Sequence, residues 1–255
     1  MGGVSELYQG DLDVGRRVVL ALEERDLGHE VAVEDLHYGA VAVAQRLDEL
    51  RPACLVLVGA VPRDRAPGSI HRRRVVATRR SPEDVQAAVS DAVTGYVDID
   101  LIVEVAEGFG ALPPRTVTVE IEPVQTDPSD QLSPEVEAAV DDLLRAVSTE
   151  VDRAPLHTVV TELEARVGDL HLEPSPATAA LEALLAELDR ADREGRWGST
   201  FALRDELVSQ LAQGRASVGM DHADWGLVWG LVEELGRLEK REAKAVTPDA
   251  GTTSG

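Results

Sequence analysis

One short run of apolar residues constrains the fold of this chain more than any other feature. Every residue from Cys54 to Val61 is apolar, and the helix breaker Pro52 lies just before the run. A short apolar run that does not alternate with polar residues is typical of a strand buried on both faces, as in a parallel sheet. Because parallel strands need crossover connections, usually helices, the run predicts an α/β fold.

The segments around this run alternate between helical and strand patterns. Residues 16–27 and 38–50 have helical spacing, and residues 31–35 between them have the pattern of a short strand. Two further strands are predicted over 69–76, after a turn, and over 116–122. Further helices are predicted from Ser81, from Asp98 or Ile99 to Phe109, and from Ser133 to about Asp152. The order predicts a mostly parallel, twisted sheet sandwiched by helices.

The chain changes character near residue 153. Leu, Ala, Glu and Arg with a helical period dominate the later residues, with four helices predicted over 156–167, 177–193, about 200–213 and about 224–244. Trp225 and Trp229 share one face of the last helix, which favours a place in a helical core. We therefore expect an α/β domain over 1–153, an all-α C-terminal extension over 154–245 and a disordered tail over 246–255.

The chain is strongly acidic, with a formal net charge of −22. Nucleic-acid phosphates require a basic surface, so we expect no nucleic-acid partner, and an acidic surface is equally unsuited to anionic membranes. No apolar run approaches the ~20 residues of a membrane-spanning helix, and no signal peptide precedes Gly10. Cys54 is the single cysteine, and a packed apolar role is favoured over a nucleophilic one. These features predict a cytoplasmic protein.

Short motifs recur in a recognisable order over about residues 5–152. They are Val14-Gly-Arg-Arg-Val18, Val33-Glu-Asp35, Leu55-Val-Leu-Val-Gly-Ala-Val61, Pro67-Gly-Ser-Ile-His-Arg72, Leu112-Pro-Pro114, Ile121-Glu-Pro123 and Leu132-Ser-Pro-Glu-Val136. This series resembles the maturation endopeptidases of nickel–iron hydrogenases. The resemblance implies an α/β sandwich. It also implies an activity that cleaves a C-terminal extension from the hydrogenase large subunit once nickel is in place.

The resemblance further implies three nickel-binding side chains, and this sequence departs from the family at all three. Leu12 stands where the family has an acid after the residue matching Asp11, and Gly59 stands where it has an Asp. Gly95 stands where the family has a His, or Thr94 does if the match shifts by one residue. Leu and Gly offer no donor atom to a divalent metal. We therefore expect the nickel site to be lost, together with most of the family's first strand.

A relocated metal site is the alternative. Asp11, Asp35 and His37 lie near predicted strand or loop ends, and carboxylate with imidazole suits nickel or zinc. The competing interpretation makes all three exposed loop residues, with Asp11 or Asp13 capping the helix that begins near Val14.

A basic strand presents a similar choice. His71 is followed by three arginines, Arg72 to Arg74. We interpret the run as a solvated edge strand whose charges discourage pairing with other chains. The alternative is a patch that contacts an acidic segment of a partner.

Two functions are compatible with these features. The first is a protein without a metal cofactor that binds or helps to assemble a hydrogenase large subunit, or binds its maturation factors. The second is an active endopeptidase that uses nickel at the relocated ligands. An unrelated small-molecule enzyme is less favoured, because the segment from Gly10 to Gly15 lacks the Lys-Ser/Thr of a phosphate-binding loop.

Overall fold

The structure is a computed structural model that describes residues 1–27, 30–78, 80–93, 97–170, 172–197, 200–214 and 222–246. Contacts between residues divide the chain into two compact units, an α/β unit, Met1–Ala154, and a helical unit, Pro155–Gly255. Nearly all of the predicted tail, from residue 247 onward, lies outside the described residues.

The α/β unit is built on one sheet with the strand order β2-β1-β3-β5-β4. Its strands are β1 (Gly2–Gly3), β2 (Glu34–Asp35), β3 (Cys54–Ala60), β4 (Ile70–Val75) and β5 (Arg115–Ile121). All neighbouring pairs are parallel except β4 with β5, which is antiparallel and places β4 at an edge. The predicted fold class is thus confirmed, and the apolar run from Cys54 forms the central strand.

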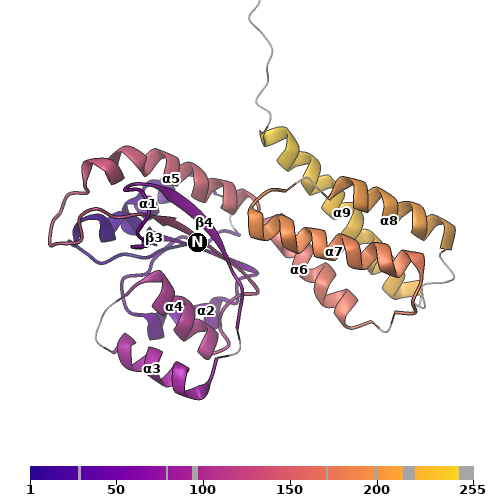
Figure 1. The fold of residues 1–255 in the computed structure, drawn as a ribbon, viewed down its shortest axis with the longest axis horizontal. Helices are drawn as coiled ribbons and strands as arrows, with labels where there is room; N and C mark the ends of the chain where they lie inside the picture. Colours follow the sequence, from indigo (N-terminus) through magenta and orange to yellow (C-terminus); the bar gives the residue numbers. More distant parts are fainter. Residues whose placement is uncertain are drawn as a thin grey trace, which may run out of the picture. The chain divides into compact units, whose positions relative to one another are not determined.

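Helices cover both faces of the sheet (Figure 1). On one face lie α1 (Val14–Glu23) and α5 (Pro134–Asp152), and on the other lie α2 (Ala40–Leu50), α3 (Pro82–Ala92) and α4 (Ile99–Gly108). Alternate residues of β3 point to the two layers, Val56 and Val58 to the first and Leu55 and Leu57 to the second. Burial on both faces is the reason this strand has no polar alternation.

The first strand is present, although the sequence predicted none. Gly2 and Gly3 pair with β2 on one side and β3 on the other, and the ladder continues where the Val4 N–H donates to the Val58 carbonyl at 2.7 Å. A Cβ atom on Gly3 would lie 2.3 Å from the carbonyl oxygen of Gly15 in α1. Glycine has low strand propensity, but here its small size permits this close approach, and packing decides the conformation. The β2 strand, in contrast, is shorter than the predicted 31–35.

The strand β5 is buried at every position, its polar residues included. Its polar residues include Glu120, which is fully buried and pairs with Arg73 of β4 at 2.9 Å. Arg72 pairs with Glu150 of α5, also at 2.9 Å. The interpretation of β4 as an edge strand is confirmed, but its arginines are not simply solvated, since these two bind carboxylates of neighbouring elements.

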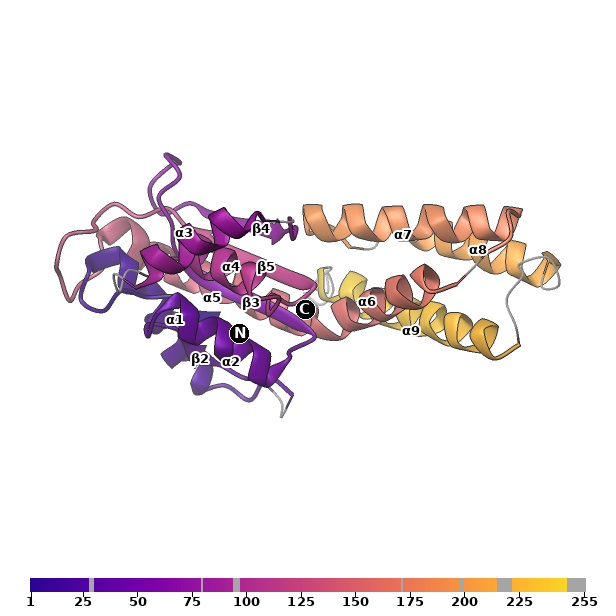
Figure 2. The same cartoon turned by 90° about the horizontal axis from the view of Figure 1, so that it is seen from below.

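The helical unit consists of α6 (Ala154–Gly168), α7 (Pro176–Glu194), α8 (Phe201–Gly214) and α9 (His222–Val246) as far as it is described. These helices lie side by side (Figure 2) and share one apolar core that includes Leu163, Leu184, Leu207 and Leu235. The rings of Trp225 and Trp229 stack with their centroids 6.2 Å apart; Trp225 belongs to this core and Trp229 packs against it, as their shared helix face predicted. No described helix is both long enough and apolar enough to cross a membrane.

Candidate functional site

A pocket of about 350 Å³ opens at the carboxyl ends of the central strands. It lies between the segment after β1, with Val4 and Glu6, the loop after β3, with Arg63, and the start of α4, with Asp98 and Asp100. We call it the carboxyl-end pocket. Ligands of open α/β sheets collect outside the carboxyl ends of the strands, which makes this pocket the candidate site.

Two of the positions where the resemblance implies nickel ligands border this region. Leu12 lines the pocket and is partly buried against the core below α1 and α5. Gly59 is close-packed: a Cβ atom there would lie 2.9 Å from the Val4 carbonyl oxygen and 3.4 Å from Cδ1 of Ile99. The third position, Gly95 or Thr94, lies outside the described residues. Of the two described positions, therefore, one carries the aliphatic side chain of Leu12. At the other, Gly59, the backbone fills the space that a ligand side chain would need.

Asp11 is fully buried, and its carboxylate joins three segments of the chain. One oxygen accepts hydrogen bonds from the backbone N–H groups of Val124 and Gln125 at 2.8 Å and from the Ser133 hydroxyl at 2.9 Å. The other accepts from the Ser133 N–H at 2.6 Å. The expectation of an exposed or helix-capping Asp11 is wrong, because its partners come from a loop more than a hundred residues later. Asp13 is also buried, and it bonds Arg16 without capping α1 through its side chain.

Asp35 and His37 lie together after β2. His37 Nδ1 is 3.2 Å from Asp35 Oδ2, and the Ser5 hydroxyl donates to the other oxygen of Asp35 at 2.8 Å. Asp11, the third member of the predicted relocated site, directs both oxygens to the backbone and hydroxyl donors of residues 124–133. Within the described residues, no group of three or more His, Cys, Asp or Glu side chains is arranged to hold a metal ion. The described side chains thus do not fit a bound nickel, and the relocated site stays a prediction.

Sequence reasoning missed a charged cluster beside the carboxyl-end pocket. The Arg63 guanidinium binds Asp100 at 2.8 Å and Glu120 at 3.2 Å, and Arg65 also reaches Glu120, at 3.3 Å. Burial works to raise the pKa of Glu120, but the arginines and the Thr118 hydroxyl outweigh it and lower the pKa to about 2. The Arg63 N–H donates to Glu122, which fixes the loop after β3. With its pKa this low, Glu120 is charged at neutral pH.

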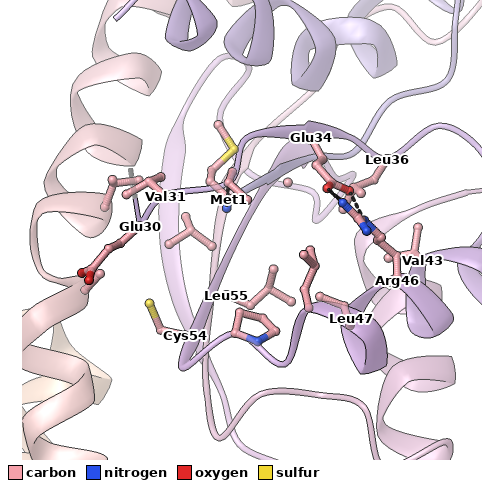
Figure 3. Close-up of a pocket in the computed structure, with 17 residues that line it drawn as sticks. Met1, Glu30, Val31, Glu34, Leu36, Val43, Arg46, Leu47, Cys54 and Leu55 are labelled. Atoms are coloured by element: carbon pink, nitrogen blue, oxygen red, sulfur yellow. Dashed lines mark hydrogen bonds and ion pairs between the residues drawn. The ribbon is translucent and has the colours of Figure 1, made fainter. Parts of the chain in front are cut away.

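A second pocket, of about 220 Å³, opens at the amino ends of the strands. Figure 3 shows Cys54 and Glu30 at one side of it and the hydrogen-bonded pair of Glu34 and Arg46 at the other, with aliphatic side chains such as Leu55 between them. Cys54 is half-buried there, and no histidine is among the described residues that line the pocket.

No family model matches the sequence, and no curated protein is detectably similar to it. Solved structures do match. A hydrogenase 2 maturation peptidase from a Thaumarchaeota archaeon is 22% identical with a TM-score of 0.39, over 57% of this chain and 92% of that one. The hydrogenase maturating endopeptidase HybD of Escherichia coli is 22% identical with a TM-score of 0.39, over 57% and 86%. A [NiFe] hydrogenase maturation protease, HycI, of Thermococcus kodakarensis is 13% identical with a TM-score of 0.40, over 59% and 88%.

The chain thus matches hydrogenase maturation endopeptidases in structure over 57–60% of its length at low identity. Identities this low concern the fold and leave activity open.

Proposed function

We propose that this chain binds a hydrogenase large subunit, or one of its maturation factors, without cleaving it. The motifs between Val14 and Val136 support the relation to hydrogenase maturation. The observation that carries the loss of cleavage is the packing at Gly59, where the Val4 carbonyl oxygen occupies the space that a side chain would need. We place the protein in the cytoplasm, with its partners in the maturation of hydrogenases.

The proposed loss has a clear physical cause. Replacing a single group that supports a metal ligand costs ~10–100-fold in metal affinity or activity. Here Leu12 and Gly59 lack donor atoms at two ligand positions, and the sequence offers Gly95 or Thr94 at the third. In the family, the nickel carried by the substrate also reports that the substrate is ready. Losing the ligands would therefore remove both peptide cleavage and recognition of the loaded nickel, and leave a pocket that binds protein.

The second candidate is an active endopeptidase with relocated ligands. The contact between Asp35 and His37, with Ser5 holding the carboxylate, favours it, because a carboxylate that orients an imidazole is a common arrangement around metal-binding histidines. It requires further ligands from residues outside those described or from the substrate.

One experiment separates the two candidates. The purified full-length chain is incubated with a nickel-loaded large-subunit precursor, with capture of the complex to report binding and mass spectrometry to report release of the C-terminal extension. We expect binding without release. Release that is lost in Asp35→Ala or His37→Ala, but kept in the matched control His71→Ala on β4, would establish the endopeptidase. Failure to bind the precursor or any maturation factor would overturn the binding role.

A further inference from the structure

Three arginines converge on one buried carboxylate near the carboxyl end of β5. Arg63 and Arg65, from the loop after β3, lie 3.2 Å and 3.3 Å from the oxygens of Glu120, and Arg73 of β4 lies 2.9 Å away. The three arginine side chains are 29%, 28% and 38% exposed, whereas the Glu120 side chain is fully buried. The guanidinium groups therefore lie between this carboxylate and solvent. We call these three arginines the arginine layer.

The arginine layer carries more positive charge than its carboxylate partners balance. Asp100 of α4 is the second partner, at 2.8 Å from Arg63 and 3.1 Å from Arg73. Among the described residues, the one carboxylate that Arg65 contacts is Glu120, which the other two arginines already bind. Three guanidinium groups thus share two carboxylates. Like charges at such short range repel, so an anion on the solvent side of the layer would relieve the repulsion.

The arginine layer also retains N–H groups for a further acceptor. A guanidinium carries five N–H donors in one plane. Arg65 donates to Glu120 through Nη1, and Arg73 donates to Glu120 through Nε and to Asp100 through Nη2. Within the described part of the chain, Nε and Nη2 of Arg65 and Nη1 of Arg73 donate to no acceptor. Planar donor pairs of this kind fit the two oxygens of a carboxylate.

The loop that supplies two of these arginines is fixed in place by Glu122. The Glu122 carboxylate accepts a hydrogen bond from the Arg63 N–H at 2.9 Å, and the Glu122 carbonyl accepts one from the Gly68 N–H, also at 2.9 Å. A Cβ atom on Gly68 would lie 2.8 Å from the Glu135 carbonyl oxygen, so the loop packs closely on the start of α5. Arg65 lies between these two anchors in the sequence. Because the loop is already ordered, binding a partner here costs little conformational entropy.

We propose that the arginine layer binds an acidic segment of a partner protein, with a Glu or Asp side chain bonded to Arg65 and Arg73 on the solvent side. Charge complementarity selects this occupant, since a basic or apolar segment would leave the repulsion among the arginines in place. The net charge of −22 does not prevent such binding, because solvent-exposed charges more than ~8 Å apart are largely screened at physiological ionic strength. This inference rests on the proposed binding function and gives the chemistry of the partner segment.

The test uses the full chain and the probe acetyl-Gly-Glu-Asp-Glu-Gly-amide, with a matched peptide that carries Gln and Asn in place of Glu and Asp. Binding is measured by calorimetry at two salt concentrations, and the arginine Nε–H signals are followed by NMR. We expect the acidic peptide to bind at least about tenfold more tightly than the matched peptide, and less tightly at the higher salt concentration. Its binding should shift the Nε–H signals of Arg65 and Arg73.

Two variants locate the binding. Arg65→Gln should lose the preference for the acidic peptide, and it should still fold because Glu120 keeps its contacts with Arg63 and Arg73, which circular dichroism checks. The matched control Arg25→Gln removes the same charge from a side chain that donates to Ser148 of α5, on the other face of the sheet. This control should keep the preference.

The outcomes also separate this inference from the proposed function. Equal binding of the two peptides, or an unchanged preference in Arg65→Gln, overturns the inference. Inorganic phosphate that binds as tightly as the acidic peptide and displaces it overturns the assignment to a partner segment. If the large-subunit precursor binds Arg65→Gln as tightly as the unchanged chain, the proposed function stands without this inference. A preference that depends on Arg65, combined with no binding of the precursor, supports the arginine layer and shifts the partner to another protein with an acidic segment.

Discussion

The buried carboxylate of Asp11 allows a test of whether this residue is structural or a metal ligand. In Asp11→Ala, the N–H groups of Val124, Gln125 and Ser133 and the Ser133 hydroxyl all lose their acceptor. A hydrogen bond to a charged group contributes about 1.5–3 kcal/mol, but the four share one carboxylate and do not add. We therefore expect the free energy of unfolding of the α/β unit to fall by about 3–5 kcal/mol.

The position of the tryptophans provides an internal control for this measurement. Trp197, Trp225 and Trp229 are the only tryptophans in the sequence, and all lie in the helical unit. Their fluorescence in a denaturant titration reports that unit, while hydrogen exchange at the Val124 and Gln125 amides reports the contacts of Asp11. We propose that residues 1–153 and 154–245 are separate domains, so the fluorescence transition should stay in place. Unchanged exchange at those amides, or a loss below about 1 kcal/mol, would refute a structural role for Asp11.

Three further predictions concern single residues. The pKa of Glu120 is about 2, below its ordinary 4.5, so its contribution to stability is present above pH 4.5 and is lost as the pH falls toward 2. In Glu120→Gln, this loss of stability between pH 4.5 and 2 should be absent when acid unfolding is followed by circular dichroism. Burial raises the pKa of Glu239 to about 7, so the helical unit should lose stability as the pH rises from 4.5 to 7, and Glu239→Gln should remove that loss in a fluorescence titration. Gly59→Ala should lower the free energy of unfolding by about 1–3 kcal/mol, measured by thermal unfolding. Gly226→Ala should not lower it, because the added carbon meets no atom within 4 Å. Gly59→Asp should not bind nickel in equilibrium dialysis.

Features encoded by neighbouring residues could be predicted from the sequence. The strand from Cys54 is apolar throughout, and Ser81 and Ser133, each followed by proline, start α3 and α5 by accepting a backbone hydrogen bond. Such signals need only a few residues of context, and the helices of the C-terminal extension were predicted from the same kind of pattern. The resemblance to maturation endopeptidases also rests on short local motifs.

Features that depend on distant partners could not be predicted. Glu120 follows the polar phase of a strand pattern that normally means solvent, but Arg63 and Arg73 cover it from two other elements. Gly2 and Gly3 form a strand because α1 packs closely over them, which their low strand propensity does not indicate. Glu6 gave no signal at all, since its place in the carboxyl-end pocket depends on the segments that fold around it.

Gly59 connects the two kinds of information. The sequence shows that Gly59 has no donor atom, but only the fold shows that the Val4 carbonyl oxygen occupies the space beside it. That carbonyl is held in place because the Val4 N–H donates to Val58 at 2.7 Å, one residue before the glycine in the same strand. A carboxylate at position 59 would therefore have to displace the segment that completes the sheet. Regaining a metal ligand there would require a change in the amino-terminal segment as well as in the residue, because the packing at this position is part of the fold.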